Sequence, residues 1–216
     1  MRTTKISNEL YEDLIKSLNN NSSNLDIIDW QVNKEILKGL YNIDHDTAQT
    51  QRAIIKDKNI RKQITSVLED FGFTNGEGQG WMCYSRAFLP TSLHVDIPQD
   101  NVEDDGYTVI IPLTTDPSIK TLVFKEKTNN PILDYWIKKQ DWSSREKLNN
   151  LSKTYDVSNG WYWQPDIVDY MELDGIADWE KGNAFCLKRS QIHCSTNFRK
   201  NGFEYKDYIL VQTNNK

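Results

Sequence analysis

The sequence predicts an α+β fold, because helical patterns fill its first third and strand patterns fill most of the remainder. Residues 80–213 hold eight candidate strands, which is the strand number of a jelly roll. With 216 residues, of which 38% are hydrophobic, the chain is long enough to bury a sizeable core. We therefore expect one domain over residues 1–216, with helical support in 1–79 and a jelly-roll core in 80–213.

Three segments of the first third carry helical patterns. Ser7 can cap a helix over residues 7–20, where leucines recur every four residues on one face. Residues 30–40 predict a second, shorter helix. Residues 47–71 form the longest pattern, with apolar residues spaced three and four apart, and a glycine-rich loop follows at 72–80.

The candidate strands are short runs rich in β-branched and aromatic residues, and turn-forming residues separate them. They are residues 81–88, 92–96, 107–113, 120–125, 167–173, 183–187, 191–195 and 206–213. In the last of them, Lys206 and Tyr208 share one face with Leu210, while Ile209 and Val211 share the other. A strand that is apolar on both faces must be covered on both, so we expect the N-terminal helices to cover its outer face.

A long insert separates the fourth and fifth candidate strands, at about residues 126–166. Long inserts in compact domains are often functional, and large aromatic side chains are usually buried. Its aromatic residues therefore have two interpretations, a lid or substrate-facing wall and a layer that packs the insert onto the strands. They are Tyr135, Trp136, Trp142, Tyr155, Trp161, Tyr162 and Trp163.

The composition narrows the class of partner and the compartment. A formal net charge of −5 and a pI of about 5.3 disfavour binding to a nucleic-acid backbone. Three cysteines without framework spacing indicate reduced thiols. The N-terminus has no apolar signal region, and no apolar run approaches the ~20 residues of a membrane span. We expect a cytoplasmic protein without a membrane partner, and its many Asn and Lys residues are typical of AT-rich genomes such as those of phages.

His94, Val95 and Asp96 form a motif that a distant His193 completes. His-x-Asp followed by a later His is the pattern of a two-histidine, one-carboxylate facial triad for non-haem Fe(II). Side chains two residues apart on a strand point to the same face, so His94 and Asp96 can share one metal if Val95 turns away. By the same alternation, Cys194 should point away from the metal. The sequence therefore predicts an Fe(II) site made of His94, Asp96 and His193.

With these residues in place, the chain resembles the iron(II)/2-oxoglutarate-dependent oxygenases, whose core is a double-stranded β-helix of the cupin-like jelly-roll type. The resemblance covers roughly residues 80–213 and implies three cofactors or co-substrates: Fe(II), 2-oxoglutarate and O2. Lys206, which opens the last strand, stands where the family places the basic residue that pairs with the far carboxylate of 2-oxoglutarate. Arg199 is the competitor for that role.

The resemblance is more specific around Tyr84. Tyr84 lies ten residues before His94, as does a tyrosine of the 2-oxoglutarate pocket in the prolyl hydroxylases that modify hypoxia-inducible factor. The motif is therefore most similar to the prolyl 4-hydroxylase-like branch, and the resemblance implies that Tyr84 binds the co-substrate. From strand spacing, we also expect Thr108 to share the co-substrate pocket and Arg86 to face the substrate.

The function predicted from these residues is hydroxylation of a C–H bond in an unidentified substrate. Halogenating relatives lack the carboxylate that Asp96 supplies here, which favours hydroxylation. The substrate is a small molecule or a protein or peptide, with a prolyl residue as one candidate. Two other classes stay open: a cupin-like metalloenzyme that does not use 2-oxoglutarate, and a non-catalytic jelly-roll binding protein.

Overall fold

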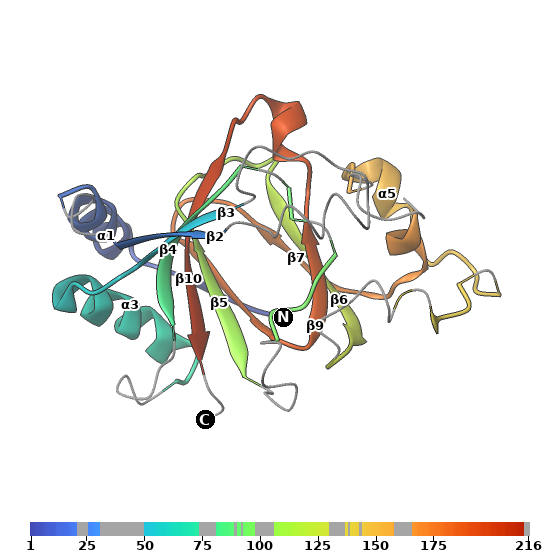
Figure 1. The fold of residues 1–216 in the computed structure, drawn as a ribbon, viewed down its shortest axis with the longest axis horizontal. Coiled ribbons are helices and arrows are strands. Elements are labelled where there is room, and N and C mark those ends of the chain that lie inside the picture. Colours follow the sequence, from blue (N-terminus) through green and yellow to red (C-terminus); the bar gives the residue numbers. More distant parts are fainter. Residues whose placement is uncertain are drawn as a thin grey trace.

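In the computed structural model, the strands form two antiparallel sheets that face each other, with two helices on the outer face of the larger sheet (Figure 1). Side chains of both sheets meet between them in one apolar cluster, which includes Ile110, Leu210, Val123 and Ala177. Among the described residues, no helix has the length and apolar content needed to cross a bilayer. The structure describes residues 1–20, 26–30, 50–73, 81–88, 90–91, 93–97, 106–129, 137, 139–142, 144–157 and 166–213.

The larger sheet has seven strands in the order β1-β8-β5-β10-β4-β3-β2, and every neighbouring pair is antiparallel. Strand β10 lies at its centre, between β5 and β4. The strands are β1 (Arg2–Lys5), β2 (Asp26–Trp30), β3 (Thr50–Ile54), β4 (Met82–Ala87), β5 (Tyr107–Pro112), β8 (Asn183–Lys188) and β10 (Lys206–Thr213).

The smaller sheet has three strands in the order β7-β6-β9, and a further segment runs along its β9 edge. That segment pairs with β9 through backbone hydrogen bonds in both directions between His94 and His193, and Ser195 donates its N–H to the carbonyl oxygen of Thr91. The strands are β6 (Lys120–Lys127), β7 (Leu173–Asp178) and β9 (Gln191–Ser195), and the short helix η4 (Phe198–Asn201) leads from β9 to β10.

Helices α1 (Asn8–Asn20) and α3 (Lys58–Asp70) cover the outer face of the larger sheet, as the left side of Figure 1 shows. The Asp57 side chain begins α3 by accepting hydrogen bonds from the backbone N–H groups of Asn59 and Ile60. The buried side of each helix packs in one cluster with Ile209 and Val211 of β10. The predicted helical cover of the last strand is therefore confirmed.

The insert packs on the outer side of the smaller sheet. It contains helix α5 (Leu151–Thr154) and is followed by η3 (Ile167–Tyr170). Trp142 is buried in a cluster with Ile192 and Cys194 of β9, and its indole N–H donates to the carbonyl oxygen of Ile137 at 2.9 Å. For Trp142, packing is therefore the observed arrangement. Tyr135, Trp136 and Trp161–Trp163 lie outside the described residues.

The α+β prediction is confirmed in its coarse form, since the structure has mainly antiparallel strands and few helices. The helix predicted at 7–20 corresponds to α1, and five predicted strands match β4, β5, β6, β8 and β9 closely, as does the last one with β10. The helix predicted at 30–40 lies outside the described residues except for Trp30, which ends β2.

The helical pattern over residues 47–71 was wrong in its first half. Residues 50–54 form β3, which pairs with the edge of β4, and the helix begins only after its Asp57 cap. Alternate burial of Ala53 and Ile55 has the period of a strand, and the open edge of β4 supplies its hydrogen bonds. The segment 1–79 is thus not purely helical, because β1, β2 and β3 also come from it.

Two strand predictions also need correction. Of the strand predicted at 92–96, the described residues 93–96 contain only an isolated pairing at His94. Asp96 donates its N–H to the carbonyl oxygen of Arg189, which is out of step with a regular ladder. Residues 167–173 begin as the helix η3, and strand β7 starts only at Leu173. The reason is the buried Asp169, whose carboxylate accepts hydrogen bonds from the Ser152 N–H and hydroxyl and ties this turn to the insert.

Candidate metal centre

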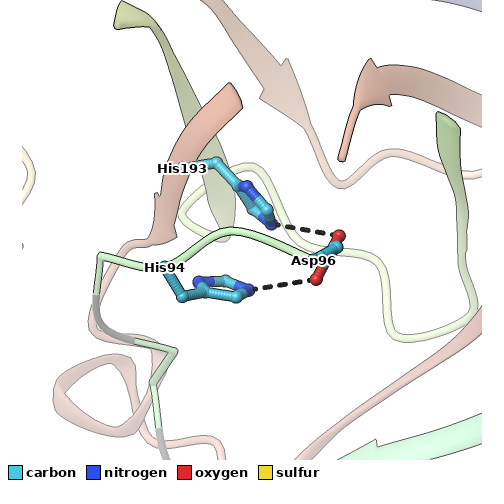
Figure 2. A group of neighbouring side chains, drawn as sticks. All are labelled: His94, Asp96 and His193. Carbon is cyan, nitrogen blue, oxygen red and sulfur yellow. Dashed lines mark ion pairs between the residues drawn. The ribbon is translucent and has the colours of Figure 1, made fainter. Parts of the chain in front are cut away.

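The three predicted metal ligands meet at the edge of the smaller sheet (Figure 2). The backbone pairing of His94 with His193 brings the two ring centroids to 4.0 Å from each other. Val95, between His94 and Asp96, turns the other way and packs in the cluster behind the sheet, as does Cys194 after His193. The alternation predicted from the sequence is confirmed, and it directs both imidazoles and the carboxylate to one point.

The ligand atoms are arranged as an open group of three. The Asp96 carboxylate lies beside the two rings and faces the Nε2 atom of each, with Oδ1 3.6 Å from His94 Nε2 and Oδ2 3.5 Å from His193 Nε2 (Figure 2). One atom from each residue lies within 4.8 Å of the others. The His193 side chain is 3% exposed, whereas that of His94 is 33% exposed. The site is therefore closed on the His193 side and accessible on the His94 side.

The hydrogen bonds of the site leave His193 Nε2 and Asp96 Oδ2 with lone pairs that can bind a metal. His193 Nδ1 lies 2.9 Å from the carbonyl oxygen of Gln191, to which it can only donate, so Nε2 keeps its lone pair on the Asp96 side. Asp96 Oδ2 is buried and accepts no hydrogen bond. A buried carboxylate oxygen without a donor is costly unless a cation binds it.

Neighbouring groups stabilise the ionised form of the Asp96 carboxylate. Burial alone would raise the pKa of Asp96, but His193, His94, the Thr108 hydroxyl and Arg52 together outweigh it and lower the pKa. Asp96 is therefore ionised at neutral pH and provides an anionic ligand. Two imidazoles and one carboxylate that occupy one face of a coordination sphere are a donor set for a divalent metal, and they leave further coordination positions open. These residues therefore fit Fe(II).

The predicted far-carboxylate partner, Lys206, lies on the inner face of β10. It is 3% exposed, and its Nζ lies 4.0 Å from the ring centroid of Trp179 and 5.4 Å from that of Phe198. Within the described residues, no carboxylate lies at ion-pair distance from it. Burial lowers the pKa of Lys206 to about 7, since only the thiol of Cys194 acts against it. A buried amine of this kind can bind, in its protonated form, an anion that comes from outside the chain.

Comparison with known proteins identifies the fold. The sequence matches no protein-family model and no curated protein. Solved structures do match over nearly the whole chain. SnoN, a non-haem α-ketoglutarate-dependent epimerase of nogalamycin biosynthesis, is 6% identical with a TM-score of 0.57, covering 99% of this chain and 78% of its own. The chain has the fold of the 2-oxoglutarate-dependent oxygenases.

Two further structures support this oxygenase fold. A prolyl hydroxylase from Trichoplax adhaerens, solved with a peptide of hypoxia-inducible factor, is 9% identical with a TM-score of 0.53 and covers 98% of this chain and 83% of its own. HygX from Streptomyces hygroscopicus, solved with nickel and 2-oxoglutarate, is 9% identical with a TM-score of 0.50 and covers 98% and 81%. At the level of the fold, the resemblance predicted from the sequence is confirmed.

The structure does not bring Tyr84 and Arg86 to the triad. Tyr84 is paired with Ile209, and both lie on the outer face of the larger sheet, in contact with the helical cluster. Arg86 is on the same face and forms a two-pronged ion pair with Asp207, at 2.8 Å for both contacts, while donating to the Tyr84 hydroxyl at 3.2 Å. The register of β4 against β10 turns Ser85 to the inner face, so its neighbours Tyr84 and Arg86 point to the outer face. The predicted roles of Tyr84 at the co-substrate and of Arg86 at the substrate are therefore contradicted.

The structure does bring Thr108 to the triad. Thr108 is fully buried on β5, and its hydroxyl lies close enough to Asp96 to help lower the pKa of that carboxyl. Arg199, the alternative to Lys206, is exposed in η4 and donates to the carbonyl oxygen of Phe88 at 3.0 Å. Of the two basic residues, only Lys206 is buried on the inner face.

Two further residues near the triad are not predicted from the sequence. They are Arg52, on β3, and Tyr208, two residues after Lys206 on β10, and both lie on the inner face. The charge of Arg52 lowers the pKa of Asp96, and the charge of Asp96 raises the pKa of Tyr208. Burial raises the pKa of Tyr208, so its hydroxyl stays protonated. Tyr208 could have been found from its two-residue spacing to Lys206. Arg52 could not, because its segment was interpreted as helix.

Proposed function

We propose that the protein is an Fe(II)- and 2-oxoglutarate-dependent dioxygenase that hydroxylates a C–H bond of its substrate. The observation that carries this proposal is the open triad of His94, Asp96 and His193, in which a buried carboxylate oxygen of Asp96 accepts no hydrogen bond. The fold shared with SnoN and HygX supports it, since those proteins are described with α-ketoglutarate or 2-oxoglutarate.

We also propose that residues 80–213 form a double-stranded β-helix, of the jelly-roll and cupin-like kind, within one domain over residues 1–216. The strand order supports this. Strands β8, β5, β10 and β4 are consecutive in the larger sheet and face β7, β6, β9 and the His94 segment in the smaller one. Strands β1, β2 and β3 then extend the larger sheet at both ends.

The residues of the chain have distinct tasks in this proposal. His94, Asp96 and His193 hold Fe(II), and the Gln191 carbonyl keeps the His193 ring in the ligating tautomer. Bound Fe(II) would supply the oxidation chemistry, in which the C–H substrate, O2 and 2-oxoglutarate give the hydroxylated product, succinate and carbon dioxide. Lys206 binds the far carboxylate of 2-oxoglutarate, with Trp179 beside it to exclude water. These tasks are positioning and desolvation rather than covalent catalysis.

The substrate is a small molecule or a protein or peptide. The structural neighbours include an epimerase of antibiotic biosynthesis and a prolyl hydroxylase bound to a peptide. A prolyl substrate stays in the proposal as one candidate, although its motif argument loses Tyr84, which lies on the outer face. Nucleic acid is disfavoured by the net charge of −5. We also propose that the protein is cytoplasmic, which is supported by three buried cysteines that form no disulfide bond with one another.

Succinate formation tests the proposal. Purified protein is incubated in air with Fe(II) and 2-oxoglutarate, with and without candidate substrates such as prolyl peptides, and succinate is quantified by mass spectrometry. We expect succinate from the wild type, none from His193→Ala, and little from Lys206→Ala. Lys125→Ala, an exposed lysine on β6, is the matched control and should behave as wild type.

The outcomes separate the competing classes. Protein that binds iron but forms no succinate, with Lys206→Ala equal to wild type, would favour a metalloenzyme that is independent of 2-oxoglutarate. Protein that binds no iron would favour a non-catalytic binding protein. Either result would contradict the proposal.

A further inference from the structure

The backbone carbonyl of Gln191 determines how His193 can bind a metal. It lies 2.9 Å from His193 Nδ1 and can only accept a hydrogen bond, so it keeps a proton on Nδ1 and leaves Nε2 for the metal. This control requires a fixed orientation of the carbonyl. The ladder between β9 and β6 is irregular at this point, so the orientation needs support from other contacts of Gln191.

Strand β6 bulges where it faces Gln191. Gln191 and His193 are two residues apart on β9, but their partners on β6, Lys127 and Val123, are four residues apart. Residues in a bulge leave the regular ladder, and their backbone polar groups need other partners. The carbonyl oxygen of Phe124 lies in this bulge, and Gln191 Nε2 donates to it at 3.3 Å.

Strand β7 has a bulge opposite the same part of β6. Gly175 and Leu173 are paired with consecutive residues of β6, so Asp174, which lies between them, has no partner in the ladder. Its carboxylate accepts the second N–H of Gln191 Nε2, at a distance of 3.1 Å. The two bulges therefore meet at one carboxamide.

The oxygen of this carboxamide also has a partner. Gln191 Oε1 accepts the backbone N–H of Lys188, the last residue of β8, at 3.0 Å. Gln191 is 6% exposed, so its side-chain hydrogen bonds are shielded from bulk water. The side chain thus joins β9 to β6, β7 and β8, and it replaces the ladder where the bulges interrupt it.

We propose that Gln191 is a positioning residue of the metal centre. Its carboxamide fixes the backbone carbonyl that keeps His193 in the metal-binding tautomer, and Asp174 supports the carboxamide from β7. Gln191 acts through His193 and not on the metal itself. This inference rests on the proposed function and deepens it, because it assigns the groups that orient one ligand.

Zn(II) affinity and the tautomer of His193 together test this proposal. The affinity is measured by titration against a competing chelator, with His193→Ala as the baseline without the site. The tautomer is measured at pH 8 in metal-free protein, from the ¹⁵N chemical shifts of the ring. We expect Gln191→Leu to bind Zn(II) about tenfold more weakly, as for the loss of a group that orients a ligand. The strict preference for the Nδ1–H tautomer should also be lost.

Two further variants identify the carboxamide as the cause. Gln191→Glu should behave like Gln191→Leu, because a carboxylate cannot donate to the Phe124 carbonyl and is repelled by Asp174. Asp174→Asn should have a smaller effect, since the Phe124 carbonyl still accepts. Combined with Gln191→Leu it should add little, because both residues belong to one hydrogen-bond network. If Gln191→Leu does not fold, these variants carry the test.

Asn149→Leu is the matched control, since Asn149 lies on the insert and its carboxamide also ties backbone groups together. It donates to the carbonyl oxygen of Met171 at 2.9 Å and accepts the N–H of Leu151 at 3.0 Å. This variant should unfold at a lower urea concentration but keep the wild-type Zn(II) affinity and tautomer. Equal Zn(II) affinity in wild type and the Gln191 variants would overturn the proposal, and so would weaker binding with an unchanged tautomer.

The wild-type titration separates this proposal from the proposed function. If the wild type binds no Zn(II) beyond the His193→Ala baseline, the metal centre fails, and this inference fails with it. If the wild type binds Zn(II) and the Gln191 variants match it, only the role of Gln191 fails.

Discussion

The two faces of the larger sheet carry cations at neighbouring positions, and their partners differ. On the outer face, Arg86 of β4 is paired through two contacts with Asp207 of β10. On the inner face, Lys206 is next to Asp207 in sequence, yet its Nζ meets only the rings of Trp179 and Phe198 at short range within the described residues. A cation that is satisfied by its own chain stabilises the fold, whereas a buried cation without an anion is available to a ligand.

The same contrast holds for the carboxylates. Asp207 is paired with Arg86, whereas Asp96 faces two imidazoles and has one oxygen that accepts no hydrogen bond. The outer face is therefore complete without a ligand, and the inner face is not.

Removing the Asp96 carboxylate should have the largest effect. We expect Asp96→Ala to weaken iron binding by at least about 100-fold, more than the loss of a residue that only supports a ligand. Iron retained after dialysis, measured by mass spectrometry, checks this. Asp207→Ala is the matched control on the outer face and should keep iron while unfolding more readily. Full iron retention in Asp96→Ala would place the metal elsewhere.

Replacing Lys206 should separate binding from stability. Lys206→Met removes the partner of the far carboxylate, so we expect 2-oxoglutarate affinity to fall about 10- to 100-fold, as for a lost charged hydrogen bond. The protein without ligands should be as stable as wild type or more stable, because a buried unpaired amine is replaced by an apolar side chain. Calorimetric titration and thermal unfolding measure the two effects. Large destabilisation together with unchanged affinity would show a structural lysine.

The stability of the ligand-free protein should depend on pH through Lys206. Its pKa is about 7 in the folded protein, because of burial, and near 10.4 when unfolded. Between these values the unfolded chain binds one more proton, so this group makes the protein more stable as pH rises, by about 1.4 kcal/mol per pH unit. Urea unfolding at pH 7.5, 8.5 and 9.5 should show this slope in wild type relative to Lys206→Met. Parallel curves for the two proteins would contradict it.

Binding of 2-oxoglutarate should be coupled to proton uptake at the same residue. At pH 8 the amine is mostly neutral in the free protein, and the far carboxylate would stabilise its protonated form. We expect about one proton to be taken up per bound 2-oxoglutarate, at most, as for a single titrating group. Calorimetry in two buffers of different ionisation enthalpy measures the number. Zero uptake in wild type would mean that another group binds the carboxylate.

Changes on the outer face should have the smallest effect on ligands. Arg86→Ala breaks the part-buried pair with Asp207, so we expect a loss of about 1–3 kcal/mol in the free energy of unfolding. Its 2-oxoglutarate affinity should stay within about twofold of wild type, as for a surface substitution remote from the site. Tyr84→Phe should change both quantities less. A tenfold loss of 2-oxoglutarate affinity in either variant would restore the roles predicted from the sequence.

The sequence is sufficient to predict which side chains share a face where a short strand pattern determines their direction. Strand alternation correctly placed His94 and Asp96 on one side of Val95, and it placed Lys206 on the face opposite Ile209. It could not assign Tyr84, because a run of residues that is buried on both faces does not reveal which face is inner. That choice depends on the register between β4 and β10, which involves residues more than one hundred positions apart.

The same limit explains the N-terminal error. Residues 50–54 become a strand because the edge of β4 offers hydrogen bonds, and this partner is distant in the sequence. Helical spacing is clear only after Asp57, where the cap and the buried Ile60 and Ile64 lie. Arg52 was therefore hidden inside a helix prediction. A residue that reaches a site from an added edge strand becomes visible only in the three-dimensional structure.

If iron and 2-oxoglutarate together complete the inner face, an anaerobic titration should detect both. Protein loaded with one equivalent of Fe(II) is titrated with 2-oxoglutarate while the visible charge-transfer absorption of the chelate is followed. We expect a band that saturates at one 2-oxoglutarate per chain, is absent in His193→Ala, and requires much more 2-oxoglutarate in Lys206→Met. Protein that holds iron but develops no band at any concentration of 2-oxoglutarate would contradict it.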